Sequence, residues 1–506
     1  MIDRFLNGIT MYRLVLYVLV AYLAAAFGLS FFHVLPFTPW MLLLSTAVIL
    51  LLCRVTNEIF AKAFDAPVNA ESYFITALIL VCLITPPRSP ADAAFYEFAA
   101  WAAVWAMAGK FIIAIRRKHL FNPAAFAVAL TALTMNDAAG WWVGTASMAP
   151  FVLAGGLLIT RKIRRFDLVI SFLIAALIAM VGLHMGDAVT AGVMMRRGLL
   201  MTPLLFFATI MLTEPLTTPP TRAMRLVYGV FTGALFAPSI HFGSFFLTPE
   251  LALLLGNVFS FVVSPKEKLL LRFQRKSQVA DKVYDFLFRS DRPFTFVPGQ
   301  YLEWTLAHAR PDTRGNRRYL TIASSPTEEG IAIGVKFHEP ASTFKKKLLA
   351  LKPGDTIVAS QRAGEFVLPR DRTKKLVFVA GGIGITPFRS MVRSLSDRGE
   401  RRDIILLYAN RTKEDIAYRD VFDAAQKTIG LQTVYTLTDR NAVPADWTGR
   451  TGHFDAAAIR AEVPDYLERE FYLSGTHAMV TSCGEVLRSM GIARSRIRKD
   501  FFPGFA

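Results

Sequence analysis

The hydrophobic positions of this chain follow two patterns, which divide it near residue 265. Before that point they form long runs with almost no charge, and after it they form shorter runs of strand or helix length. A helix that spans a membrane needs ~20 mostly apolar residues. The long runs cover residues 14–32, 35–53, 72–87, 98–115, 119–136, 141–160, 168–185, 198–213, 226–246 and 251–264. We therefore expect residues 1–265 to form a multi-pass α-helical membrane domain of about ten helices.

The second half of the chain changes character once more, from strands alone to strands that alternate with helices. Up to residue 370 the runs are short and strand-like, as in Lys282–Arg289, and Pro-Gly pairs separate them. Beyond it a buried-strand run, Lys374–Ala380, is followed by the helical spacing of Phe388–Arg398, and this alternation repeats. The pattern predicts a β-barrel over residues 266–370 and a doubly wound α/β domain over residues 371–506.

Composition supports a membrane protein and excludes several other classes. The chain of 506 residues is 53% hydrophobic and carries 57 Lys+Arg against 39 Asp+Glu, a net charge of +18. This balance excludes a disordered chain, a coiled coil and an ordinary soluble enzyme. The three cysteines are too few for a disulfide framework or a four-cysteine cluster, and we expect no metal site.

The positive charge is explained mainly by orientation in the membrane. With the N-terminus inside, the segments on that side hold 14 Lys and Arg residues, and the opposite loops hold 3. This imbalance follows the positive-inside rule, and an even number of helices then places both termini in the cytoplasm. We expect a multi-pass protein of the cell (inner) membrane, with the lipid bilayer as a partner. The sequence has no basic stripe with interleaved aromatic residues, so nucleic acid is not an expected partner.

A glycine-rich turn follows the first strand of the predicted α/β domain. It contains Gly381, Gly382 and Gly384, and Thr386 and Pro387 follow at the start of a helix. Glycine lets a backbone approach a ligand closely, and the N-terminus of a helix offers free N–H groups to an anion. The turn therefore predicts a phosphate-binding segment at the edge of the sheet.

The last strand of the same domain ends at Ser474-Gly475, with Met479 shortly beyond it. Ligands of open α/β sheets bind at the carboxyl edge of the strands, where this segment and the glycine turn both lie. We therefore expect the two segments to form one ligand site.

Four consecutive residues of the barrel region are Arg318, Tyr319, Leu320 and Thr321. They resemble the flavin motif of the ferredoxin–NADP reductase family, which is Arg, any residue, an aromatic residue, and Ser or Thr. The resemblance implies that Arg318 pairs with flavin phosphate, which its planar guanidinium can bind bidentately, and that Thr321 bonds the isoalloxazine. Leu320 stands where the family has its stacking aromatic residue, and Tyr319 sits one position early.

The resemblance covers nearly all of residues 266–506. Ser342 and Thr343 stand where the family contacts the flavin diphosphate, and Phe505 belongs to a segment that resembles the closing tail of the family. The glycine turn resembles the nicotinamide-dinucleotide turn of the family, and the segment SGTHAM, with Gly475 and Met479, resembles its motif beside the nicotinamide.

What this resemblance implies is an NAD(P)H-dependent flavin oxidoreductase with FAD as cofactor. In that family the position of Ser474 lies beside the nicotinamide ring, so we expect Ser474 and Thr386 at the place of hydride transfer. Arg411 and Lys413 could serve the 2′-phosphate of NADPH or be solvated charges. Solvated charges are the commoner case, which favours NADH and leaves NADPH open.

Two breaks in the apolar runs point to a second flavin. Asn122-Pro123 is typical of a helix start, and Glu214-Pro215 puts a carboxylate at the end of an apolar run. Together with residues 75–87 they resemble the membrane flavin subunits of the Rnf complex and of the sodium-pumping NADH:quinone reductase. The resemblance implies FMN or another flavin in the membrane domain. The Ser/Thr-Gly-Ala-Thr segment that carries covalent FMN in those subunits is not found here, so no attachment residue is assigned.

We therefore expect electrons to pass from cytoplasmic NAD(P)H through FAD, and through a membrane flavin, to an acceptor in the membrane or outside. That acceptor is a quinone or an extracytoplasmic flavoprotein. A redox-driven sodium or proton transporter is an alternative, although the membrane acids are few: Asp92, Glu97, Asp187 and Glu214. A haem-type transmembrane ferric reductase is another, although the histidines of this half are scattered: His33, His119, His184 and His241.

Overall fold

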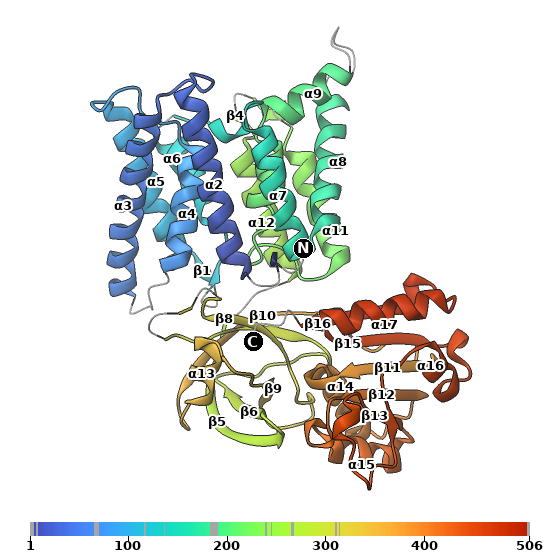
Figure 1. Cartoon of the computed structure of the whole chain (residues 1–506). Helices are drawn as coiled ribbons and strands as arrows, with labels where there is room; N and C mark the ends of the chain where they lie inside the picture. The colour runs from blue at the N-terminus through green and yellow to red at the C-terminus, as the bar shows by residue number, and fades with distance from the viewer. Residues whose placement is uncertain are drawn as a thin grey trace. The chain divides into compact units, whose positions relative to one another are not determined.

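The chain folds as two compact units, Met1–Lys268 and Leu269–Ala506 (Figure 1). The computed structural model describes residues 5–6, 9–64, 70–115, 118–135, 137–182, 191–237, 240–243, 245–264, 268–308, 311–312 and 314–502. Each unit has hydrophobic cores of its own. The domain limits expected at residues 265 and 370 stay predictions.

The first unit is a helical bundle built on the long apolar runs, each of which contains helix (Figure 1). Threonines begin the first two long helices, because Thr10 accepts a hydrogen bond from the N–H of Arg13 and Thr38 accepts one from that of Met41. The described helical segments are α2 (Met11–Phe31), α3 (Pro39–Ala63), α4 (Ala70–Leu83), α5 (Ala93–Phe111), α6 (Pro123–Met135), α7 (Ala149–Ile163), α8 (Phe166–Gly182), α9 (Ala191–Met201), α10 (Leu204–Phe206), the π-helical turn η2 (Phe207–Met211), α11 (Arg222–Leu235) and α12 (Pro249–Val263). Two hairpins, β1–β2 (Ala114–Ile115, Lys118–His119) and β3–β4 (His241–Phe242, Phe245–Phe246), lie between helices.

The expectation of about ten spanning helices is not supported by the described residues. Two helices, α2 and α3, are long and apolar enough to cross a membrane, with mean hydropathies of 2.3 and 1.8. A third span arises if α9 and the segment Leu204–Met211, bent by 65° relative to each other, count as one. Others are too short: the 13 residues of α6 extend about 20 Å, against a hydrocarbon core of ~30 Å. The apolar runs include turns and loops, which composition alone does not separate from helix.

The first sheet of the second unit has the strand order β8–β7–β10–β5–β6–β9 and forms a half-barrel. Phe273, Phe286, Leu302 and Trp304 fill its core, and α13 (Thr343–Leu349) adds Phe344 to it. The pairs β5–β6, β6–β9, β7–β8 and β7–β10 are antiparallel. The strands are β5 (Lys268–Ala280), β6 (Val283–Ser290), β7 (Tyr301–Thr305), β8 (Arg317–Thr321), β9 (Ile331–Lys336) and β10 (Thr356–Ala363). Where the sequence predicted a barrel, the structure has this half-barrel.

The second sheet is parallel and has the order β14–β13–β12–β11–β15–β16. Its strands are β11 (Leu376–Gly381), β12 (Ile404–Asn410), β13 (Gln432–Leu437), β14 (Arg450–Thr451), β15 (Glu470–Thr476) and β16 (Ile497–Phe502). Helices α14 (Thr386–Asp397) and α15 (Arg419–Ile429) cover one face, and α16 (Ala456–Glu462) and α17 (His477–Ser489) cover the other (Figure 1).

Alternation along β11 explains why helices cover both faces of this sheet. Phe378 and Ala380 lie in the core shared with α14 and α15, whereas Val377 and Val379 lie in the core shared with α16 and α17. The sequence of β11 is therefore a nearly continuous run of apolar residues. The strand order reverses between β11 and β15, which is the switch point where doubly wound sheets bind ligands.

Candidate functional site

The two predicted ligand segments of the α/β domain meet at the carboxyl edge of β11 and β15. These strands are parallel neighbours, with Ala380 opposite Ser474. A Cβ on Gly384 would lie 2.4 Å from the carbonyl oxygen of Ser474 and 2.6 Å from the Cα of Gly475. Because no side chain fits there, Gly384 allows the two turns to pack together into one surface.

Two further predicted residues, Gly381 and Met479, extend this contact. A Cβ on Gly381 would lie 3.2 Å from Sδ of Met479, and one on Gly475 would lie 3.0 Å from it. Gly382 has a φ of +53°, in the left-handed region that favours glycine. Thr476, where the family usually has proline, accepts a hydrogen bond from the N–H of Met479 at 3.4 Å and begins α17.

The hydroxyl of Ser474 is fully buried and makes no hydrogen bond within the described part of the chain. Leaving a buried polar group unsatisfied costs about 1–3 kcal/mol. A hydroxyl of this kind at the end of a central strand fits a ligand that supplies the missing bond. Thr386 is also buried, but its hydroxyl donates to the carbonyl oxygen of Ile383 at 3.2 Å, and Pro387 follows it in the first turn of α14.

Arg318 lies in β8 with its guanidinium 5.0 Å from the centre of the Phe344 ring. Its Nη1 donates to the carbonyl oxygens of Arg314 and Arg317 at 2.8 Å and 2.7 Å. Burial lowers the pKa of the Arg318 guanidinium to about 10, and the carboxylate of Asp312 opposes that effect.

A second cation, Lys345, lies beside this guanidinium. Burial lowers the pKa of the Lys345 ammonium to about 8, and the nearby charges of Arg318 and Arg314 add to the effect. An anionic ligand would relieve the repulsion among these cations, and a diphosphate offers oxygens for bidentate binding. The donor set therefore fits the phosphates of FAD.

The start of α13 lies next to these cations. Ser342 accepts a hydrogen bond from the N–H of Lys345 at 3.3 Å and so caps the helix. The N–H of Thr343 donates to Oδ2 of Asp312 at 3.0 Å, and the Thr343 hydroxyl accepts from the N–H of Asp312 at 3.0 Å. The sequence analysis missed Asp312 and Lys345, although the basic run that follows Thr343 was a signal for the second.

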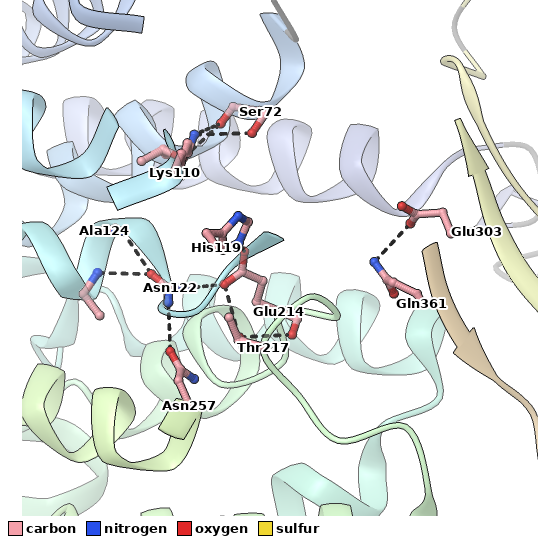
Figure 2. Close-up of polar contacts among 12 residues, drawn as sticks. Ser72, Lys110, His119, Asn122, Ala124, Glu214, Thr217, Asn257, Glu303 and Gln361 are labelled. Atoms are coloured by element: carbon pink, nitrogen blue, oxygen red, sulfur yellow. Dashed lines mark hydrogen bonds and ion pairs between the residues drawn. The ribbon is translucent and has the colours of Figure 1, made fainter. Parts of the chain in front are cut away.

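The flavin-motif residues divide between the two faces of β8. Tyr319 is 43% exposed and points away from Arg318, because successive residues of a strand alternate. Its hydroxyl donates to Oε2 of Glu303 at 2.8 Å. Gln361 donates to the same oxygen at 3.3 Å (Figure 2).

Leu320 shares the face of Arg318 and packs against the core of the half-barrel, and Thr321 is buried. Leu320 and not Tyr319 therefore converges with Arg318 on one face of the strand. Phe505 lies outside the described residues.

The first unit holds a cluster of polar side chains from several elements (Figure 2). The carboxylate of Glu214 accepts hydrogen bonds from Nδ2 of Asn122 at 3.0 Å and from the hydroxyl of Thr217 at 3.2 Å. Nε2 of His119 lies 3.2 Å from its other oxygen. The N–H of Asn122 donates to Oδ1 of Asn257 at 2.8 Å, which joins α6 to α12.

The predicted helix start at Asn122 is confirmed, since its side-chain oxygen accepts from the N–H groups of Ala124 and Ala125, both at 3.1 Å. The histidines considered for haem do not gather in the described residues. His33 and His241 are exposed, and His119 contacts Glu214. His184 lies outside the described residues.

Comparison with known proteins agrees with this geometry. A family model described as "Oxidoreductase NAD-binding domain" matches residues 378–485. The glycine betaine monooxygenase reductase subunit of Pseudomonas aeruginosa is 27% identical over 237 residues, which are 46% of this chain and 64% of the relative. The stachydrine N-demethylase reductase subunit of Rhizobium meliloti is 29% identical over 45% of this chain and 65% of the relative.

A flavohemoprotein of Bacillus cereus is 24% identical over 45% of this chain and 59% of its own length. Among solved structures, the flavohem-like FAD/NAD binding domain of nitric oxide dioxygenase from Vibrio cholerae aligns with a TM-score of 0.41 at 18% identity, over 46% of this chain and 98% of that domain. The chain thus spans about three fifths of the length of the curated relatives it matches.

These matches concern the C-terminal half, which carries a ferredoxin–NADP reductase-like NAD-binding domain. The expected class, an NAD(P)H-dependent flavin oxidoreductase with FAD and NAD(P)H as cofactors, is confirmed for this half. The resemblance of the N-terminal half to membrane flavin subunits stays a prediction.

Proposed function

We propose that the whole chain is a membrane-bound NAD(P)H-oxidising flavoprotein that passes electrons from cytoplasmic NAD(P)H through FAD to an acceptor in the membrane or outside it. The observation that supports this most strongly is the packing of the Gly384 turn against Ser474, whose buried hydroxyl has no hydrogen-bond partner among the described residues. Helices α2 and α3 support a membrane location for the N-terminal unit. The acceptor in this proposal is a quinone or an extracytoplasmic flavoprotein, reached through FMN or another flavin in that unit.

In this proposal Arg318 and Lys345 bind the diphosphate of FAD, together with the segment Ser342-Thr343 at the start of α13. The close position of the two cations favours a doubly charged ligand over a neutral one. Leu320 offers an apolar surface on the same face, in place of a stacking ring. When bound, FAD accepts a hydride and releases electrons singly.

The turn at Gly381, Gly382 and Gly384 binds the diphosphate of the nicotinamide dinucleotide, because glycine lets the backbone approach a ligand closely and the N-terminus of a helix offers N–H groups to an anion. The Ser474 hydroxyl donates a hydrogen bond to the nicotinamide and so orients the ring. Thr386 and Met479 lie beside the nicotinamide. Orientation of this kind contributes to the rate by holding the reacting atoms at near-attack distance.

Charge placement beyond β12 supports NADH as the preferred reductant. Arg411 forms an ion pair with Asp439 at 3.2 Å, and Lys413 forms one with Asp446 at 2.5 Å. Both cations considered for a 2′-phosphate therefore already have a carboxylate partner. A phosphate would compete with these carboxylates and be repelled by them.

The membrane route is tested with the full chain reconstituted in liposomes. NADH oxidation is measured with and without a short-chain quinone in the bilayer, and with ferricyanide trapped inside. We expect oxidation to accelerate with either acceptor. A rate that neither acceptor changes, in a preparation that still contains FAD reducible by NADH, contradicts the membrane route and leaves the flavin reductase intact.

A further inference from the structure

A strained residue lies at the contact between the half-barrel and the α/β domain. Tyr418, which immediately precedes α15, has a φ of +59°, a conformation that bulky side chains rarely adopt. Its ring is buried, and its hydroxyl donates a hydrogen bond to Oδ1 of Asp285 in β6. Strain of this kind persists where the surroundings fix a residue, and it is concentrated at functional positions.

Gly334 shows how closely the two parts fit. It pairs with Asp285 across β6 and β9. A Cβ on Gly334 would lie 2.2 Å from the hydroxyl of Tyr418 and 2.9 Å from Cγ2 of Thr386. The bare backbone of β9 therefore supports both Tyr418 and the turn that carries Thr386.

Charged groups surround the hydrogen bond between Asp285 and Tyr418. Arg389 in α14 holds its guanidinium 5.7 Å from the centre of the Tyr418 ring and forms a two-pronged ion pair with Glu328, which precedes β9. Asp420 in α15 adds a further negative charge near Asp285.

A second ion pair, between Lys336 in β9 and Asp415, joins the same two parts at 2.5 Å. Burial raises the pKa of the Asp285 carboxyl to about 6, against the opposing effects of the Tyr418 hydroxyl and Arg389. At neutral pH the contact thus holds a buried carboxylate, which is costly to keep.

We propose that Asp285 and Tyr418 are positioning residues for hydride transfer, because their hydrogen bond sets the Thr386 turn against β9 and thereby fixes how the nicotinamide meets FAD. The inference rests on the proposed function of the C-terminal half. Neither residue needs to touch a ring, since each acts through the contact of Gly334 with Thr386. A displacement of about 1 Å between reacting groups can slow a reaction ~100-fold.

The direct test is Tyr418→Phe in the full-length protein, studied by anaerobic stopped-flow reduction with NADH. The limiting rate of flavin reduction should fall by about tenfold or more, while FAD content and the dissociation constant of NADH change less than about twofold. Gly334→Ala drives a methyl group into the same contact and should give the same pattern.

The chain contains a matched control inside the α/β domain. The hydroxyl of Tyr435 donates to Oδ1 of Asp423 at 3.0 Å, and the guanidinium of Arg419 lies 5.3 Å from its ring. Tyr435→Phe removes the same kind of bond, away from the half-barrel, and should leave the reduction rate unchanged.

Asp285→Asn separates a positioning role from a structural one. The variant removes a buried charge, so its thermal midpoint at pH 7.5 should stay level or rise while flavin reduction slows. The wild-type rate should fall below about pH 6, as Asp285 takes up a proton and its bond to Tyr418 loses charge assistance. Asp285→Asn should lack that step.

A wild-type rate in both Tyr418→Phe and Gly334→Ala, or the wild-type pH profile in Asp285→Asn, would overturn the inference. Wild-type protein that NADH and NADPH cannot reduce would instead overturn the proposed function, so the two failures are distinguishable.

Discussion

The hydroxyl of Ser474 lies at the end of a central strand, buried and without a hydrogen-bond partner in the described residues. In the sheet, Ser474 pairs with Ala380 of β11 and with Asp500 of β16. A small buried polar group of this kind is suited to orienting a ring. A role in orienting the ring can be separated from a role in stability alone by measuring the rate of flavin reduction.

Ser474→Ala should slow flavin reduction by NADH about five- to thirtyfold, equivalent to about 1–2 kcal/mol in the barrier, with FAD content unchanged. Stopped-flow absorbance at saturating NADH measures the step. Ser396→Ala is the control, since Ser396 near the end of α14 also has a buried hydroxyl that finds no hydrogen-bond partner among the described residues, and it lies away from the turn. Equal rates in the wild type and Ser474→Ala would remove Ser474 from the site.

Arg318→Ala should weaken FAD binding roughly ten- to a hundredfold, because it removes charge-assisted bonds of about 1.5–3 kcal/mol. Equilibrium titration of the deflavinated protein with FAD gives the affinity. The neighbouring variant Arg317→Ala serves as the control, because Arg317 lies on the other face of β8, 3.8 Å from Glu303. Retention of wild-type affinity in Arg318→Ala would show that the flavin motif is assigned to the wrong residues.

At the scale of elements, the contact between half-barrel and α/β domain should make stability depend on pH. The pKa of Asp285 is raised from 3.8 to about 6, so the folded protein binds this proton more tightly than the unfolded one. Stability should therefore fall as pH rises from about 4 to about 6, by up to roughly 3 kcal/mol.

Thermal unfolding across that pH range checks this expectation, with Asp285→Asn as the comparison. The stability of Asp285→Asn should change less than that of the wild type between about pH 4 and about pH 6. Parallel curves for the two proteins would mean that Asp285 titrates normally.

The helices of the first unit are joined by buried amides, which gives a second prediction at this scale. Asn257→Leu leaves the buried N–H of Asn122 without its acceptor and should cost about 1–3 kcal/mol. Asn57→Leu is the control, because in the described part of the chain the buried Asn57 amide nitrogen has no hydrogen-bond partner, so its loss should be neutral or stabilising.

The cysteines of this unit report its unfolding. Cys53 and Cys82 are fully buried, so a thiol-reactive dye should label them only as the unit opens. Earlier labelling on heating in Asn257→Leu than in Asn57→Leu is the expected order, and the reverse order would contradict the role of the amide bond.

Local patterns predicted the α/β sheet well because the side chains that fill its two cores form recognisable apolar runs in the sequence. Apolar residues fill the first five positions of β11, and a glycine, Gly384, stands where a side chain would collide with the backbone of Ser474. The length of the membrane helices was not predictable in the same way, since turns such as the one at Pro203 are as apolar as the helices beside them.

Contacts between residues far apart in the chain could not be predicted from the sequence either. Asp285 and Tyr418 are 133 residues apart, and neither stands in a motif. Tyr319 illustrates the limit within a motif, because only the strand register shows that it faces Glu303 and not Arg318.

At the scale of the whole molecule, the proposed function gives the two units different tasks. The C-terminal half carries the nicotinamide and flavin chemistry, and the N-terminal unit carries the helices that can cross a membrane. The proposed route from one to the other requires that electrons enter at FAD in the C-terminal half. The central claim is therefore the presence of a flavin that NAD(P)H reduces.

The most direct measurement is the absorption spectrum of the purified full-length protein, recorded without oxygen before and after addition of NADH or NADPH. The account predicts a flavin spectrum that bleaches within the mixing time or shortly after it, with FAD recovered by acid extraction. A colourless protein, or a flavin that neither NADH nor NADPH reduces, would contradict the account.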